Sequence, residues 1–305
     1  MELPYYINYP GKFLDEIGNY KYVTFNENGI PVVDYSLIDM PASGIQYNPA
    51  LVSLYAIGIM DRYISVKDDS CEAIFFKQVN FLRKTIKHKK NEMGIWEYRF
   101  DLPSWNQKSP WISALAQGFG LSAFSRAYLM TSDAIWLELM ENVLNSFKYQ
   151  IQNGGVCHTD KTGNKWFEEY PSEPPSHVLN GFIYALFGLL DFHKVAGNVD
   201  ALRLFKDGIS TLKQNITRYD TGYWSLYSLD SSDGGIISDV HYHRDIHVPQ
   251  IKALYELTNE EIFKTVHARW QNYTDNPSSL LRRRLFHLPQ RIVKKIYRCL
   301  HTRSN

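Results

Sequence analysis

Tyrosines stand beside a carboxylate in Glu169-Tyr170 and beside a histidine in Tyr242-His243, and a further tyrosine, Tyr227, lies three residues before Asp230. Such groups suit proton transfer at a carbon next to a carboxylate, where a base removes the hydrogen and fixed donors or cations stabilise the enolate-like charge. With an ordinary pKa of about 10, a tyrosine needs neighbouring cations or donors to act as a base, and none to act as an acid. The pattern indicates acid–base chemistry.

Other catalytic patterns are weaker. The run HYHRDIH places His241, His243 and His247 at a spacing that a metal could use, but no accompanying carboxylate or thiolate ligands are recognisable elsewhere in the sequence. We therefore favour a structural or proton-handling role for these histidines. No phosphate-binding glycine loop and no nucleophile elbow is present in the sequence. The sequence predicts neither a metal nor an organic cofactor.

Helices must position these residues. Apolar residues recur three and four positions apart in eight segments, which form four consecutive pairs. The predicted helices are 49–64 with 72–86, 113–129 with 133–151, 177–195 with 199–216, and 249–257 with 260–273.

Three connectors between the pairs share one pattern, in which turn residues precede an aromatic, strand-like stretch: GIWEYRFDLP, GNKWFEEYPS and TGYWSLYSLD. They recur about every 65 residues, and self-similarity at a fixed period indicates a repeat architecture. We predict a mainly α protein, an incomplete (α/α) toroid of about four helix pairs with β-hairpin connectors and a short N-terminal β arm. Equivalent connectors would bring their aromatic residues to one cleft, although a plug at the mouth of the toroid is the alternative.

The ends of the chain are different in character. Residues 21–35 alternate well enough for a hairpin around Asn28-Gly29. Residues 280–300 form a basic amphipathic segment, which suits an acidic membrane surface, a partner such as a glycosyltransferase, or simply solvent. We divide the chain into an arm (1–45), a toroid (46–275) and a basic tail (276–305).

Composition narrows the class of protein. The chain has 305 residues, 44% hydrophobic content and a net charge of +1, so a bound polyanion would be met by a few placed cations and not by a global field. No nucleic-acid partner is predicted. Cys71, Cys157 and Cys299 show neither metal-ligand nor disulfide spacing and are expected to be free thiols. Without a signal peptide or an apolar span, we expect a cytoplasmic protein, with contact to the inner membrane face through the tail as an open alternative.

The run WFEEYPSEPPSHVLNGFIYALFGLLDF, residues 166–192, closely resembles the C-terminal domain of D-glucuronyl C5-epimerases. Residues 109–133 and 219–254 are similar to other parts of that domain, so that the resemblance extends over about 46–273. It implies an enzyme that inverts uronic-acid residues within a polysaccharide, converting D-glucuronate to L-iduronate in a heparosan-like chain without an obligatory cofactor. It also implies a homodimer.

The resemblance also implies the site residues. Glu169 and Tyr170 match the family's catalytic Glu-Tyr, and Tyr227 and Tyr242 match two later active-site tyrosines. We assign Glu169, supported by Tyr170, to one face of the sugar and Tyr242 to the other, with Tyr227 binding the uronate or assisting transfer. Gln46, Tyr47, Asn48, Trp111 and Gln117 are either sugar contacts or helix-start and packing residues. The other candidate substrate contacts are Trp96, Tyr98, Arg99, Trp166, Asn180, His243 and Arg244.

The chain departs from the family at one point. Members carry an Asp-Leu-Arg-His run after the first later tyrosine, whereas Tyr227 is followed here by Ser228-Leu229-Asp230-Ser231. If the lost arginine normally meets the substrate carboxylate, another cation must do so, and Arg244 and Arg99 are the candidates.

Three other functions remain open as alternatives. A polysaccharide lyase would remove the same C5 proton and then eliminate the C4 oxygen, and a shared fold does not separate the two reactions. A glycoside hydrolase would need paired carboxylates such as Glu169 and Asp245, roughly 5 to 9.5 Å apart. The third alternative is a sugar-binding subunit of a capsule-assembly complex, in which the subunit itself has no catalytic activity.

Overall fold

The structure is a computed structural model that describes residues 2–38, 43–229 and 235–285. The chain divides into two compact units, Met1–Gln214 and Asn215–Asn305. The three-part division predicted from the sequence differs from these units and stays a prediction.

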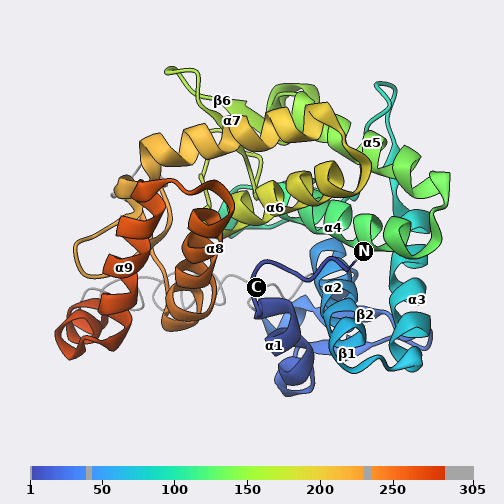
Figure 1. Cartoon of the computed structure of the whole chain (residues 1–305), viewed down its shortest axis with the longest axis horizontal. Helices are drawn as coiled ribbons and strands as arrows, with labels where there is room; N and C mark the ends of the chain where they lie inside the picture. Colours follow the sequence, from blue (N-terminus) through green and yellow to red (C-terminus); the bar gives the residue numbers. More distant parts are fainter. Residues whose placement is uncertain (1, 39–42, 230–234, 286–305) are drawn as a thin grey trace, which may run out of the picture. The chain divides into compact units, whose positions relative to one another are not determined.

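Unit 1 consists mainly of helices (Figure 1). The pairs α2 with α3, α4 with α5, and α6 with α7 follow one another, and α2, α4 and α6 are neighbours. Buried residues occupy nearly all of α4 and α6, whereas α3 and α5 bury one stripe, as expected for inner and outer helices. The helices are α1 (Tyr9–Glu16), α2 (Pro49–Val66), α3 (Asp69–Thr85), α4 (Ala114–Thr131), α5 (Ala134–Lys148), α6 (Leu179–Ala196) and α7 (Val199–Asn215).

Glycines allow the inner helices α4 and α6 to approach closely. A Cβ atom at Gly188 would lie 2.1 Å from the carbonyl oxygen of Gly118, and one at Gly118 would lie 2.5 Å from Cα of Ala185. Neither position could carry a side chain without moving a backbone. The sequence pattern of small residues thus fixes the spacing between α4 and α6, whose N-terminal ends carry the first candidate site.

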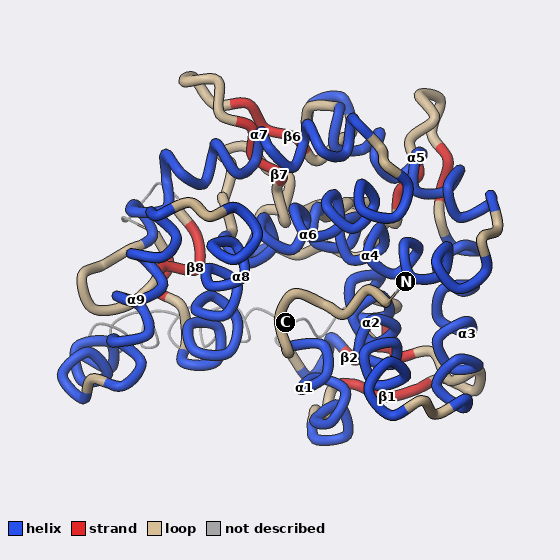
Figure 2. The backbone as a smooth tube through the Cα atoms, in the orientation of Figure 1, coloured by secondary structure: helices blue, strands red, loops and turns tan. Residues whose placement is uncertain are grey.

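Short β-structures connect the helices (Figure 2). The N-terminal sheet pairs β1 (Val23–Phe25), β2 (Pro31–Asp34) and β3 (Ile45–Gln46) in antiparallel order, and Gly29 has the positive φ of +67° that its turn requires. Each of the three connectors forms a two-stranded antiparallel sheet. These are β4 (Lys87–His88) with β5 (Gly94–Ile95), β6 (Cys157–Thr159) with β7 (Lys165–Phe167), and, in unit 2, β8 (Leu226–Ser228) with β9 (Ile236–Ile237).

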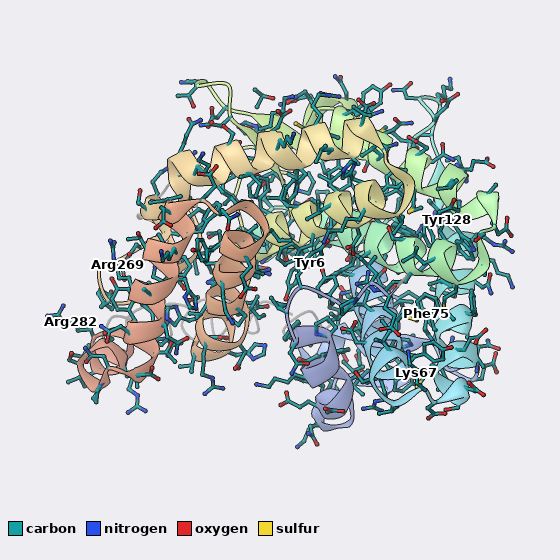
Figure 3. The ribbon with its side chains drawn as sticks, in the orientation of Figure 1. Tyr6, Lys67, Phe75, Tyr128, Arg269 and Arg282 are labelled. Atoms are coloured by element: carbon teal, nitrogen blue, oxygen red, sulfur yellow. The ribbon has the colours of Figure 1, made fainter. Side chains whose placement is uncertain are left out.

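Unit 2 packs α8 (Val248–Thr258) against α9 (Glu261–Asp275). A π-helix, Tyr242–His247, leads directly into α8. Trp224 and Trp270 are fully buried and form the centre of this unit. Arg269 of α9, labelled in Figure 3, lies 2.9 Å from a carboxylate oxygen of Asp220 and ties α9 to the segment before β8.

The structure confirms the predicted fold class and each of the eight predicted helices, with ends shifted by a few residues. It also confirms the hairpin around Asn28-Gly29. The sequence reading missed α1 and the π-helix. Cys71 and Cys157 are free and buried, and Cys299 lies outside the described residues.

Most of the basic tail, 286–305, also lies outside the described residues. Its described part is helical at 277–285, where the buried Arg283 donates from Nε to the carbonyl of Ser238 and lies over the Trp224 ring. Among the described residues, no helix has the length and apolar character needed to cross a bilayer.

Candidate active site

The loop after β7 carries Glu169 and Tyr170, and Glu168 fixes this loop in place. The buried Glu168 carboxylate accepts hydrogen bonds from the His177 backbone N–H at 2.9 Å and from Ser176 Oγ at 3.3 Å, and it lies 2.6 Å from His177 Nδ1. The Glu168 carbonyl accepts from the N–H of Ala114, the first residue of α4. The loop is therefore anchored beside the N-terminal ends of α4 and α6. The sequence reading gave Glu168 no role of its own.

The Glu169 carboxylate lies directly over the first turn of α6. Glu169 is 4% exposed, and a Cβ atom at Gly181 would lie 2.2 Å from its Oε2. Only glycine leaves room for this carboxylate, which gives the Asn180-Gly181 pair of the sequence match a physical reason. Asn180 is buried on the same turn.

Aromatic rings hold Tyr170. Its ring stacks on Trp105 with 4.5 Å between centroids and an interplanar angle of 9°, and it lies 5.9 Å from the Trp111 ring. Trp111 in turn stacks on Tyr98 at 4.0 Å. The structure thus brings together Tyr170, Trp111 and Tyr98, which were named from the sequence, with Trp105, which was not. Its position in a loop nine residues before α4 gave no signal.

Asn48 and Tyr98 have structural contacts. Oδ1 of Asn48 caps α2 by accepting from the Leu51 N–H, and it also accepts from the Tyr98 hydroxyl at 3.0 Å. Nδ2 of Asn48 donates to the hydroxyl of Tyr35. Burial keeps the pKa of Tyr98 well above its ordinary value, so the phenol is neutral. Tyr47, in contrast, is 47% exposed and offers its ring to solvent.

Three further predicted contacts are buried packing residues. Trp96 and Trp166 are each 1% exposed, and such rings have no free face on which a sugar could stack. Trp96 donates from Nε1 to the Leu82 carbonyl, and Trp166 stacks on His177 at 4.1 Å. The fully buried Gln117 donates from Nε2 to the Gly94 carbonyl and accepts from the Trp96 N–H. Their contacts correct the sequence interpretation, because they support the site without being able to touch a sugar in this conformation.

In unit 2 the tyrosines Tyr227 and Tyr242 are in contact. Their ring centroids are 4.8 Å apart in an edge-to-face arrangement, with Tyr227 on β8 and Tyr242 at the first position of the π-helix. A π-helix is rare and often marks a functional site. The irregular turn places Tyr242 beside β8 and buries His243 and His247 beneath.

Hydrogen bonds fix the tautomers of both buried histidines. Nε2 of His243 lies 3.1 Å from the Trp270 carbonyl, which can only accept, so this nitrogen carries the proton. Burial lowers the pKa of His243 to about 4, so the ring is neutral and its Nδ1 accepts from Ser225 Oγ at 2.8 Å. Since Ser225 has a single hydroxyl proton, Nδ1 of His247 donates to the same Oγ at 2.9 Å. Both nitrogens of His243 are engaged and its side chain is fully buried, which supports the structural role and corrects the prediction that His243 contacts the substrate.

The cations proposed to replace the lost arginine are paired with carboxylates. Arg244 binds Asp245 through Nε and Nη2, both at 3.0 Å, and this pair raises the pKa of Arg244. Arg99 lies 3.2 Å from Glu97. Asp230 and Ser231, where the chain departs from the family, lie outside the described residues. A role for Arg99 or Arg244 in binding the uronate stays a prediction.

The predicted catalytic residues thus form two groups, Glu169 with Tyr170 in unit 1, and Tyr227 with Tyr242 in unit 2. That both groups serve one cleft stays a prediction. In the described part of the chain, no cluster of three or more His, Cys, Asp or Glu side chains could hold a metal ion.

Comparison with known proteins finds relatives of this chain. An uncharacterised protein of Methanocaldococcus jannaschii is 31% identical over 83% of this chain and 86% of its own length. A D-glucuronyl C5-epimerase of Caenorhabditis elegans is 34% identical over 60% of this chain, which spans only 31% of the worm protein.

The GH76A α-1,6-mannanase of Salegentibacter superposes over 88% of this chain and 70% of its own, with a TM-score of 0.54 and 15% identity, and shares the fold alone. Residues 90–272, more than half of the chain, match the family described as D-glucuronyl C5-epimerase C-terminus. The chain belongs to this family of D-glucuronyl C5-epimerase C-terminal domains.

Proposed function

We propose that this protein is a polysaccharide epimerase that converts D-glucuronate into L-iduronate residues within a heparosan-like chain. The observation that carries the proposal is that the family match spans both groups of candidate residues, Glu169 with Tyr170 and Tyr227 with Tyr242. The worm relative bears the name of this activity and supports the same proposal.

The reaction is redox-neutral and needs two proton-transfer groups. A base takes the proton from C5, and the electron pair of the C5–H bond moves into the adjacent carboxylate to give an enolate-like intermediate. An acid then delivers a proton to the opposite face of C5, which forms the new C5–H bond and inverts the centre. No co-reactant is consumed.

Our proposal divides these roles between the two groups of residues. Glu169 is held over Gly181 and Tyr170 is held by Trp105, so both are fixed before substrate arrives, as an efficient proton-transfer group must be. In our proposal they act on one face of the sugar. Tyr242 acts on the other face, and Tyr227, in contact with it, binds the uronate or assists transfer.

Incubation with heparosan in deuterated water tests the proposal. We expect deuterium at C5 of the uronate residues, iduronate in the product and chains of unchanged length. Unsaturated chain ends would indicate a lyase, and shorter saturated chains would indicate a hydrolase. If neither heparosan nor another glucuronate polymer changed at all, the enzymatic proposal would be abandoned in favour of a sugar-binding protein.

Tyr242→Phe provides the sharpest variant. Because it removes only the hydroxyl, we expect polymer binding to remain and C5 exchange to fall by about a hundredfold or more, the range typical of a lost acid–base group. Tyr128→Phe is the matched control, because it removes the same hydroxyl group from the last turn of α4 (Figure 3). Full exchange activity in Tyr242→Phe would remove this residue from the mechanism.

A further inference from the structure

Unit 1 carries two hollows beside the β4–β5 hairpin. The first, about 240 Å³ in volume, lies between the C-terminal end of α3 and the hairpin, and Tyr47, Phe81, Lys84, Lys87 and Arg99 line it. The second, about 290 Å³, is lined by Lys89, Lys108, Trp111 and Pro171, among others. Glu97 lines both hollows, so they adjoin. We call the two together the hairpin track.

Positive charge dominates the hairpin track. Glu97 is the single carboxylate among the described residues that line it, against five lysine or arginine side chains. Lys89 and Arg99 both pair with Glu97, which lowers its pKa and keeps it ionised. Lys84 and Lys87 are exposed and form no ion pair with any described residue. Residues 84–108 hold six lysines and arginines but three carboxylates, although the whole chain is close to neutral.

Aromatic faces accompany these cations. The Tyr47 ring is 47% exposed and packs against Phe81 with 4.7 Å between centroids, while Asn26 holds its hydroxyl. A flat ring held in place at the wall of a hollow suits stacking against a sugar, whose C–H face is apolar and whose rim is polar. Cations beside such a ring favour an acidic polysaccharide over an acidic peptide, which offers no comparable flat faces.

The track leads to the candidate catalytic residues of unit 1. Pro171, which lines the second hollow, directly follows Tyr170, and the Trp111 ring lies 5.9 Å from the Tyr170 ring. We propose that the hairpin track binds the stretch of acidic polysaccharide on one side of the reacting uronate, with Lys84 and Lys87 meeting its carboxylates. This inference rests on the proposed function and adds subsites outside the catalytic residues.

Charge reversal tests the track. The variant Lys84→Glu/Lys87→Glu is compared with the control Lys21→Glu/Lys77→Glu, which changes the net charge equally and includes a residue two turns earlier on α3. At low salt, we expect kcat/KM of Lys84→Glu/Lys87→Glu to fall on both substrates. The fall should be about tenfold larger on heparosan than on a heparosan tetrasaccharide, a difference of roughly 1.4 kcal/mol. Raised salt should shrink this difference, because it screens exposed charges. Equal losses on polymer and tetrasaccharide, or equal losses in the control, would overturn the proposal.

Direct binding separates this inference from the proposed function. Heparosan affinity is measured for the wild type, the charge-reversed variant and Tyr47→Ser, with polyglutamate and single-stranded DNA as competing polyanions and thermal melting as the check on folding. Weaker heparosan binding in both variants, with polyglutamate binding unaffected by Tyr47→Ser, supports the track even if no C5 exchange occurs. If Tyr47→Ser lost polyglutamate or DNA binding in parallel with heparosan binding, the track would be a non-specific cationic patch and the sugar site would be refuted.

Discussion

Single atoms decide how the candidate site of unit 1 is built. The carboxylate of Glu169 occupies the space that any side chain at position 181 would need, and the neighbouring Glu168 fixes the loop through Ser176 and His177. Two adjacent glutamates therefore have separate tasks. One is committed to hydrogen bonds with the backbone and side chains of its own loop, and the other is held at the start of α6 for chemistry.

Gly181→Ala tests this arrangement. The added methyl group would lie 2.2 Å from Glu169 Oε2, so the carboxylate must move. We expect C5 exchange to fall by about a hundredfold, the cost of a displacement of about 1 Å in a catalytic group. The helix itself should tolerate the change, because alanine is a better helix former than glycine. Gly18→Ala, where an added Cβ meets nothing within 4 Å, is the control, and undiminished activity of Gly181→Ala would show that Glu169 need not be so placed.

At the scale of elements, the helices followed from the sequence because each carries a long apolar period and several have clear ends. Asn48 and Pro49 begin α2, and Gly197 ends α6 with a positive φ. The π-helix did not follow, since the run 242–247 contains chemistry-bearing residues but no periodicity that distinguishes it from an α-helix. Short α1 was missed because the sequence reading took its region as part of a β arm.

The candidate site was also predictable only in part. The tyrosines and Glu169 were found through a family motif, Trp111 through its place in the family-like segment 109–133, and Tyr98 through the repeat of aromatic connectors. Burial was not predictable from the connector pattern, because Trp96 and Trp166 lie in these connectors and yet are each only 1% exposed. Whether a ring faces solvent depends on how its hairpin packs against α4 or α6. This packing cannot be predicted from the residues of the connector alone.

The π-helix gives unit 2 a defined pH dependence. Burial lowers the pKa of His243 from 6.5 to about 4, so between these values the unfolded chain binds the proton and the folded chain does not. The free energy of unfolding should therefore rise with pH, by about 3 kcal/mol from pH 4 to pH 7 through this residue. Asp61 in unit 1 acts in the opposite direction, because burial raises its pKa to about 6.

His243→Gln isolates the contribution of the histidine. Urea unfolding of wild type and variant at several pH values gives the difference in unfolding free energy, from which the Asp61 effect cancels. We expect the variant to lose the part of the rise between pH 4 and pH 6.5 that His243 supplies, whereas His247, whose pKa burial also lowers, keeps its own part. A difference that stays constant over this range would mean that the buried ring titrates normally.

At the scale of the whole molecule, a buried polar network ties the N-terminal segment to the inner helices of unit 1. Arg126 on α4 and Asp191 on α6 are 1% and 0% exposed and lie 2.9 Å apart. The hydroxyl of Tyr6, which lies in the segment before α1 and is labelled in Figure 3, donates to the other oxygen of Asp191 at 2.6 Å, and the Tyr6 ring stacks on Phe187. Three segments far apart in the sequence thus meet at one carboxylate, at the C-terminal ends of α4 and α6, away from the Glu169 loop.

Asp191→Asn should destabilise the protein more than any surface change. It leaves the Arg126 charge buried without its counter-ion, and Nε and Nη2 of Arg126 already have no hydrogen-bond partner among the described residues. We expect the free energy of unfolding, measured by circular dichroism in urea, to fall by about 3 to 5 kcal/mol. Glu261→Gln, which breaks the exposed pair with Lys264, should cause no resolvable change. The double variant Arg126→Met/Asp191→Leu should recover most of the loss, because apolar replacement removes the buried charge itself. A double variant as unstable as Asp191→Asn would instead assign the stability to the hydrogen bonds of Asp191, above all that of Tyr6.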